Sequence, residues 1–202
     1  MIDTFNQVAR RVPTWSVYVL GLMVAGFIMA LVITNNAGPD PVKALEKGLG
    51  ERGLQFLIFA LCITPLRWAG INMIKFRRAV GLVAFALIAL HFTTWIVLDM
   101  GLRWSEIPAE LYKRPYILIG FGAFLGMIPL AITSNNRSIK RLGAGTWKRL
   151  HWLAYPVTLA GAVHFVMIGK VYSADSVFYL AVVVAVLAAR WARARKSSAV
   201  SA

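Results

Sequence analysis

Six long apolar segments, separated by short polar ones, constrain the fold of this chain more than any other feature. They lie near residues 15–35, 51–70, 79–98, 115–134, 149–169 and 174–191. A helix of about 20 apolar residues crosses the hydrocarbon core of a bilayer. The intervening segments contain turn formers, such as Asn35-Asn36-Ala37-Gly38-Pro39 and Ser134-Asn135-Asn136, and none is long enough to separate two domains. We therefore expect an all-α membrane protein, a single bundle of about six transmembrane helices over residues 1–202.

The composition supports a membrane protein. Hydrophobic residues make up 59% of the 202 residues and charged residues only 15%, whereas soluble domains carry about 25% charge. The apolar run that follows Arg10 and Arg11 is too long for the core of a cleavable signal peptide. The single cysteine, Cys62, excludes an intramolecular disulfide or a Cys-x-x-Cys redox pair, and we interpret it as a buried small residue.

Basic residues are confined largely to one side of the expected membrane. With six spans, both termini and the loops near 71–78 and 135–148 share a side, which holds fifteen of the 22 basic residues and one of the eight acids, Asp3. These fifteen are Arg10, Arg11, Arg67, Lys75, Arg77, Arg78, Arg137, Lys140, Arg141, Lys148, Arg149, Arg190, Arg193, Arg195 and Lys196. The positive-inside rule places this side, with both termini, in the cytoplasm. Topology and contacts with lipid headgroups explain the net charge of +14, so nucleic-acid binding is not expected.

Three histidines are the candidates for chemistry, because ionisable groups within membrane spans are usually functional. His91 lies 13 residues beyond Arg78, and His164 lies 15 residues beyond Arg149. At 1.5 Å per residue both stand about 20 Å above the cytoplasmic edge, on two helices that run in the same direction. Neutral imidazole is a common haem ligand. Spacing alone leaves two interpretations open: axial ligation of one haem iron by His91 and His164, or a proton relay.

The third histidine, His151, is expected near the cytoplasmic edge, two residues past Arg149. It lies 13 residues before His164, about 140° away on a straight helix, although Pro156 between them would kink the helix. Arg77 is expected at a similar depth. Arg77, Arg78, Lys148 and Arg149 are candidates to contact haem propionates or a flavin phosphate, against an alternative role as topology charges. Trp147, Trp152 and Tyr155 are typical of an interfacial aromatic belt, with the flanks of a ring-shaped cofactor as the alternative.

The stretch Gly145-Thr146-Trp147-Lys148-Arg149-Leu150-His151-Trp152-Leu153-Ala154-Tyr155 resembles the signature of the ferric-reductase-like transmembrane family. The stretch Arg77-Arg78-Ala79-Val80-Gly81-Leu82, followed by His91-Phe92, resembles the same family. The resemblance covers nearly the whole chain and is closest to the members without an attached flavin or NADPH domain. These are haem-binding membrane subunits of bacterial protein-methionine-sulfoxide reductase systems.

The resemblance implies a function that composition does not. Such subunits carry electrons through b-type haem across the bacterial inner membrane, from the quinone pool or a cytoplasmic flavin-linked donor. The acceptor is a periplasmic molybdopterin enzyme, MsrP, which reduces methionine sulfoxide, a reversible lesion, in oxidised proteins. The resemblance thus implies one or two haems b and FMN as cofactors, and an electron-transfer subunit whose partner performs the catalysis. A ferric or other metal reductase and a proton-coupled transporter remain alternatives.

One departure from the family pattern concerns the inner site. Related oxidases and ferric reductases carry two histidines on the third helix and two on the fifth. Here the third helix has only His91, and Arg77 stands near the place of the missing partner. The outer pair, His91 with His164, carries over from the family, whereas the inner site keeps only His151. The resemblance leaves open whether His151 binds a second haem or another cofactor.

Overall fold

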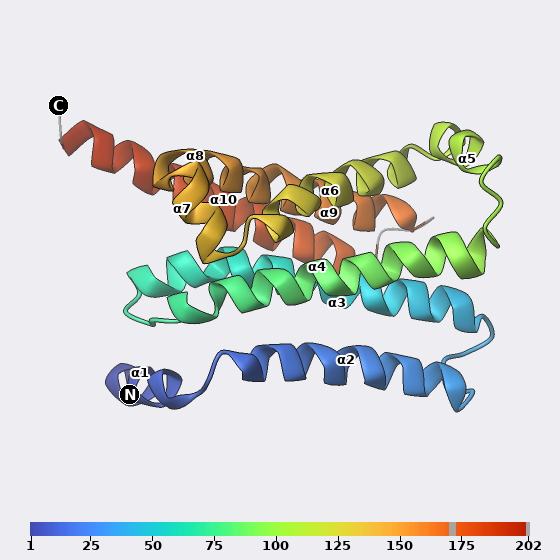
Figure 1. Ribbon diagram of the computed structural model, residues 1–202, viewed down its shortest axis with the longest axis horizontal. Coiled ribbons are helices and arrows are strands. Elements are labelled where there is room, and N and C mark those ends of the chain that lie inside the picture. The colour runs from blue at the N-terminus through green and yellow to red at the C-terminus, as the bar shows by residue number, and fades with distance from the viewer. Residues whose placement is uncertain (170–172, 201–202) are drawn as a thin grey trace.

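The computed structural model describes residues 1–169 and 173–200, with side chains up to residue 196, and this part of the chain contains helices and no strands (Figure 1). The α-helices are α1 (Ile2–Arg11), α2 (Trp15–Ile33), α3 (Pro41–Trp68), α4 (Arg77–Thr94), α5 (Ile107–Lys113), α6 (Pro115–Ile132), α7 (Asn136–Leu142), α8 (Ala144–Leu150), α9 (Ala154–Ile168) and α10 (Ala174–Val200). Short helices of other types are η1 (Ile74–Phe76) and η3 (His151–Leu153), both 3₁₀, and η2 (Trp95–Asp99), a π-helix.

Six helical segments of the described chain are long and apolar enough to cross a membrane, as the sequence predicted. They are Trp15–Ile33, Pro41–Trp68, Ile74–Asp99, Pro115–Ile132, Ala144–Ile168 and Ala174–Lys196. Many large apolar side chains on them face outward, among them Leu22, Phe27 and Phe178. Exposed apolar surface of this extent is stable only in lipid, where helices also satisfy their own backbone hydrogen bonds.

The second spanning helix differs from the expectation. It begins at Pro41 rather than near residue 51, because Asp40 caps it: the Asp40 carboxylate accepts the Lys43 amide at 2.9 Å, and Pro41 occupies the first helical position. As a result Glu46, which precedes the expected start, lies inside the 28-residue helix together with Glu51.

The fifth spanning segment is also not a regular helix. The chain passes from α8 through the 3₁₀ turn η3 into α9, and Pro156 stands in the first turn of α9. A 3₁₀ turn changes the number of residues per turn, and proline cannot donate a backbone hydrogen bond. The angular relation between His151 and His164 therefore departs from that of a straight helix.

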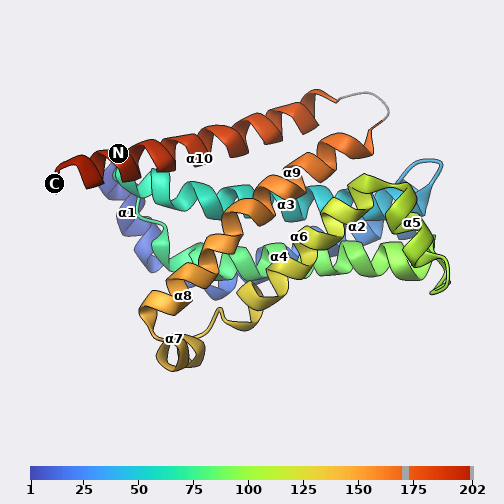
Figure 2. The same cartoon turned by 90° about the horizontal axis from the view of Figure 1, so that it is seen from above.

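The helices form an elongated bundle with two distinct ends (Figures 1 and 2). The amino terminus, the last residues of α10 and helices α7 and α8 share one end, which we call the terminal end, and α5 lies at the other. Helix α3 packs along α4, α6 along α9, and α10 along α9 and α3. Helix α2 lies at one edge against α3 and α4, and within it only Gly21 is fully buried.

Candidate functional site

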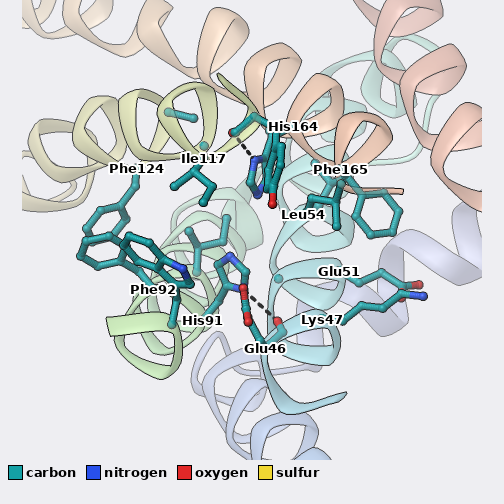
Figure 3. A pocket seen from close by; sticks show the side chains of 18 of the residues that line it. Glu46, Lys47, Glu51, Leu54, His91, Phe92, Ile117, Phe124, His164 and Phe165 are labelled. Carbon is teal, nitrogen blue, oxygen red and sulfur yellow. Dashed lines mark hydrogen bonds between the residues drawn. The ribbon is translucent and has the colours of Figure 1, made fainter. Parts of the chain in front are cut away.

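His91 of α4 and His164 of α9 project toward each other across the middle of the bundle (Figure 3). The centroids of their rings are 6.3 Å apart, and the ring planes are inclined by 74°. Both residues are partly buried. The structure thus brings together the two histidines that the sequence placed at one depth on parallel helices.

Both rings are held by the same kind of hydrogen bond. The Nδ1 atom of His91 lies 2.8 Å from the carbonyl oxygen of Glu46 in α3, and the Nδ1 atom of His164 lies 2.6 Å from the carbonyl oxygen of Tyr116 in α6. A backbone carbonyl can only accept, so Nδ1 carries the proton in each ring. The Nε2 atom of each neutral imidazole therefore keeps its lone pair, which is the form that binds a metal.

A cavity of about 540 Å³ surrounds the two rings. Its walls are mainly apolar, and on one side Phe92 stacks on Phe121 and Phe124, with centroid distances of 5.7 and 4.7 Å. Leu54 and Phe165 close the opposite side (Figure 3). The volume is in the range of small-molecule and cofactor sites, which are typically lined by apolar and aromatic side chains.

Charged groups also line this cavity, and they come from the segments nearest the end of the bundle opposite the terminal end. Lys43 is paired with Glu46 at 3.1 Å and with Asp99 at 2.8 Å, and Arg114 is paired with Glu110 at 2.9 Å. Lys47 lines the cavity and makes none of the ion pairs found in the described chain. The cavity therefore combines an apolar interior with a charged edge, where Glu46 and Glu51 lie beside the basic residues and Lys47 is a cation that could meet an anionic group.

These features fit a b-type haem. Metal–imidazole bonds are about 2.0–2.1 Å long, so two imidazoles on opposite sides of one metal have ring centroids roughly 6 Å apart once a ring radius is added on each side. The observed 6.3 Å agrees with this separation. A bis-histidine haem takes two axial ligands from the protein, and within the part of the chain that the structure describes the two Nε2 atoms make no hydrogen bond.

His151 lies outside this cavity, at the start of η3. The Thr133 hydroxyl donates to the carbonyl of Pro129 at 2.6 Å, so its oxygen is left to accept from His151 Nε2 at 3.1 Å. His151 therefore has the opposite tautomer from the other two histidines, with its lone pair on Nδ1. The Trp147 ring stacks on the imidazole at 3.9 Å, so Trp147 contacts His151 instead of serving only as part of an aromatic belt.

The other predicted inner residues are distributed unevenly around His151. The Arg77 guanidinium interacts electrostatically with His151, Tyr155 and Arg190. Arg190 donates to the Tyr155 hydroxyl at 2.8 Å and to the Leu61 carbonyl at 2.9 Å.

The other three predicted cations lie at the start of α4 and on α8. Arg78 donates to the side chain of Asn136 at 2.8 Å, and Lys148 and Arg149 are exposed on α8. Of the four predicted cations, Arg77 thus interacts electrostatically with His151, whereas Lys148 and Arg149 precede His151 by three and two residues and have exposed side chains.

Sequence reasoning missed two sets of residues around the cavity. The first is a polar network between α3 and α10, in which Gln55 donates to Tyr179 at 2.6 Å and the Tyr179 hydroxyl donates to Glu51 at 3.1 Å. The i, i+4 spacing of Glu51 and Gln55 was visible in the sequence, but their partner on α10 was not. The second set consists of Gly50 and Gly120, against which the His91 and His164 rings lie.

Comparison with known proteins gives a consistent result over most of the chain. The family described as ferric reductase like transmembrane component matches residues 50–162. Three curated relatives named protein-methionine-sulfoxide reductase heme-binding subunit MsrQ align over 180 residues, which is 89% of this chain. The relative from Agrobacterium fabrum (strain C58 / ATCC 33970) is 43% identical, with 83% of its own length covered. Those from Brucella ovis (strain ATCC 25840 / 63/290 / NCTC 10512) and Brucella suis (strain ATCC 23445 / NCTC 10510) are 44% identical, with 81% of their lengths covered.

No solved structure matches the chain. The family match covers α4, α6 and most of α3 and α9. It includes His91, whereas Glu46 and His164 lie just outside the matched residues. The relatives extend the similarity to nearly the whole chain. By its sequence, this chain belongs to the ferric-reductase-like transmembrane family, among the MsrQ heme-binding subunits.

Proposed function

We propose that this chain carries electrons across a bacterial inner membrane through b-type haem to a periplasmic methionine sulfoxide reductase of the MsrP type. The observation that carries the proposal is the His91–His164 pair: two imidazoles 6.3 Å apart, each with Nδ1 bonded to a backbone carbonyl and Nε2 free. A haem held there would supply one-electron reduction and oxidation, and no proton would have to move with the electron. The relatives' name, heme-binding subunit, supports the same assignment.

In this proposal each residue of the site has a distinct task. His91 and His164 would hold the haem through their Nε2 atoms, and the carbonyls of Glu46 and Tyr116 keep their tautomers and orient the rings. The apolar walls exclude water. Lys47, which makes none of the ion pairs found in the described chain, would contact a haem propionate, whereas Lys43 and Arg114 are already paired with carboxylates.

The direction of transfer follows from the orientation proposed for the bundle. Both termini are assigned to the cytoplasm, because fifteen of the 22 basic residues gather at the terminal end. The cavity with the paired histidines opens among charged residues of the opposite end, which is then periplasmic. Electrons would leave the chain at this end, toward the partner.

An inner cofactor is proposed on the cytoplasmic side, with His151 and Arg77 as its first contacts and Arg78, Lys148 and Arg149 as further candidates. The electrostatic interaction of Arg77 with His151 supports it. The group held there is either a second haem or FMN, whose phosphate arginine can bind in a bidentate way. Ligation through Nε2 of His151 requires the contact with Thr133 to be given up, whereas a flavin beside Trp147 does not.

The test is reconstitution of the purified chain in liposomes with an MsrP-type reductase outside. Dithionite-reduced protein should show the absorption bands of low-spin haem, and adding methionine sulfoxide with the partner should reoxidise it. A reduced quinone and a flavin reductase with NADPH and FMN are then compared as donors from the cytoplasmic side.

Each alternative has its own result in this experiment. Protein purified from haem-replete cells without any haem absorption would overturn the proposal and favour a transporter. Haem that is reoxidised rapidly by ferric chelates but not by the partner with methionine sulfoxide would favour a ferric reductase. Liposomes without the partner are the control for spontaneous reoxidation.

A further inference from the structure

The two paired imidazoles are held in the same way, although they contact different helices. The ring of His91 lies against Gly50 of α3, and the ring of His164 lies against Gly120 of α6. In both cases the accepting carbonyl belongs to the residue four positions before the glycine, Glu46 or Tyr116. One local arrangement thus occurs twice in the bundle.

Helix geometry explains why a glycine stands at this spacing. In an α-helix the carbonyl of residue i accepts the amide of residue i+4, so the Glu46 carbonyl already accepts the amide of Gly50. An imidazole that shares this carbonyl, which has two lone pairs, must lie over the backbone at the glycine. Neither glycine has a positive φ angle, so conformational freedom is not the reason for glycine here.

The space at each glycine is too small for a methyl group. A Cβ at position 50 would lie 2.9 Å from Nδ1 and 3.1 Å from Cε1 of His91. A Cβ at position 120 would lie 2.7 Å from both Nδ1 and Cε1 of His164. The histidine ring therefore fills the space beside each glycine, and any larger residue at position 50 or 120 must displace the ring or separate the helices.

We propose that Gly50 and Gly120 are the positioning residues of the haem ligands: they admit the imidazole rings to backbone carbonyls and thereby set the hydrogen bond and orientation of each ligand. The inference rests on the proposed haem site. Because both acceptors are main-chain atoms, no side-chain replacement at 46 or 116 removes them. The glycines are the positions at which this hydrogen bond can be altered by substitution.

The chemical consequence concerns the reduction potential. An Nδ1–H that donates to a carbonyl makes the imidazole a stronger electron donor, and a stronger donor stabilises ferric over ferrous iron. Alanine at either glycine pushes the ring away and weakens this hydrogen bond, so the haem becomes easier to reduce. The contact at Gly120 is the tighter of the two, and its hydrogen bond is the shorter, so Gly120→Ala should have the larger effect.

The experiment compares Gly50→Ala and Gly120→Ala with two matched controls in the full-length, haem-loaded chain. The controls are Gly122→Ala, also in α6, and Gly81→Ala in α4, because a Cβ at either position would meet nothing within 4 Å. Alanine is the better helix former in all four, so helix propensity does not separate the variants from the controls. Potentiometric titration and electron paramagnetic resonance of the ferric haem are the readouts.

We expect the ferrous-to-ferric ratio at a given potential to rise about tenfold in Gly120→Ala, which is about 59 mV for one electron, and less in Gly50→Ala. The resonance spectrum should change in both and in neither control. Wild-type potential and spectrum in Gly120→Ala with full haem content would overturn the inference. If Gly120→Ala does not accumulate, the same two readouts on Gly50→Ala decide. Wild-type protein without haem would instead overturn the proposed function.

Discussion

Replacing His164 by alanine removes one of the two proposed ligands, and the structure indicates what else is lost. The Tyr116 carbonyl still accepts the amide of Gly120, so no backbone acceptor is left unsatisfied. The deleted ring opens onto the existing cavity of about 540 Å³. Large-to-small replacements cost about 2–5 kcal/mol, and a void that joins an open cavity should cost near the lower limit, about 2 kcal/mol. The fold should therefore survive.

His164→Ala should abolish the low-spin haem spectrum completely, although it should lower the stability of the fold only a little. One haem per chain should lose its bis-imidazole ligation, because the neighbouring Phe165 and Gly161 offer no ligand atom. Free imidazole at millimolar concentration should enter the vacated space, donate to the same carbonyl and restore the low-spin absorption bands. Haem-to-protein ratio and visible spectrum, with and without imidazole, are the measurements.

His151→Ala is the control for this prediction. It should leave the outer low-spin signal intact, since His151 contacts Thr133 and Trp147 and does not line the cavity. A normal spectrum for His164→Ala together with complete loss of haem in His151→Ala would refute the pairing of His91 with His164. His91 with His151 would then be the better assignment.

Three further outcomes are expected. Reporter fusions in the 135–148 loop should report the cytoplasm and fusions at 104–110 the periplasm; the reverse would invert the assignment of inner and outer sites. The ring planes of the paired histidines are inclined by 74°, and imidazole planes that are nearly perpendicular leave two iron d orbitals almost equal in energy. The ferric haem should therefore give a strongly anisotropic low-spin signal in electron paramagnetic resonance. A rhombic spectrum typical of parallel rings would contradict the geometry. Tyr179→Phe removes the hydroxyl that is hydrogen-bonded to Gln55 and Glu51. This loss should lower the free energy of unfolding by about 1 kcal/mol and the Tm in detergent by about 2–4 °C. An unchanged Tm would show that this network adds no stability.

Hydropathy predicted the six spans because a bilayer imposes one length and one composition on every helix that crosses it. The equal depth of His91 and His164 followed from counting residues from the charged ends of two parallel helices. This prediction needed no knowledge of which helices are neighbours, and the contact between the rings bears out its geometry.

The start of the second span was not predictable in the same way. Between positions 46 and 52 the chain carries four charged residues. They lower the mean hydropathy of any sequence window that contains them, so this stretch is predicted as a loop. They are tolerated in a helix because Glu46, Lys47 and Glu51 line the cavity instead of facing lipid. Only the tertiary structure shows where that side of α3 points.

The tautomer of each histidine also lay beyond the sequence. The acceptors for His91 and His164 are backbone carbonyls of other helices, and backbone atoms leave no mark in residue identity. His151 resembles the others in the sequence, yet the 3₁₀ turn at η3 directs its Nε2 to Thr133. The motif around His151 revealed the family but not this contact.

The peripheral position of α2 has a consequence for biogenesis. This helix carries no charged residue, and within it only Gly21 is fully buried, at a point where a Cβ would lie 2.5 Å from Val83. A segment so apolar can leave the insertion machinery as an independent unit before its neighbours are made, and helix association follows insertion as a separate stage. Its exposed residues should tolerate exchange among apolar types, whereas at Gly21 the docking of α2 on α4 requires the absence of a side chain.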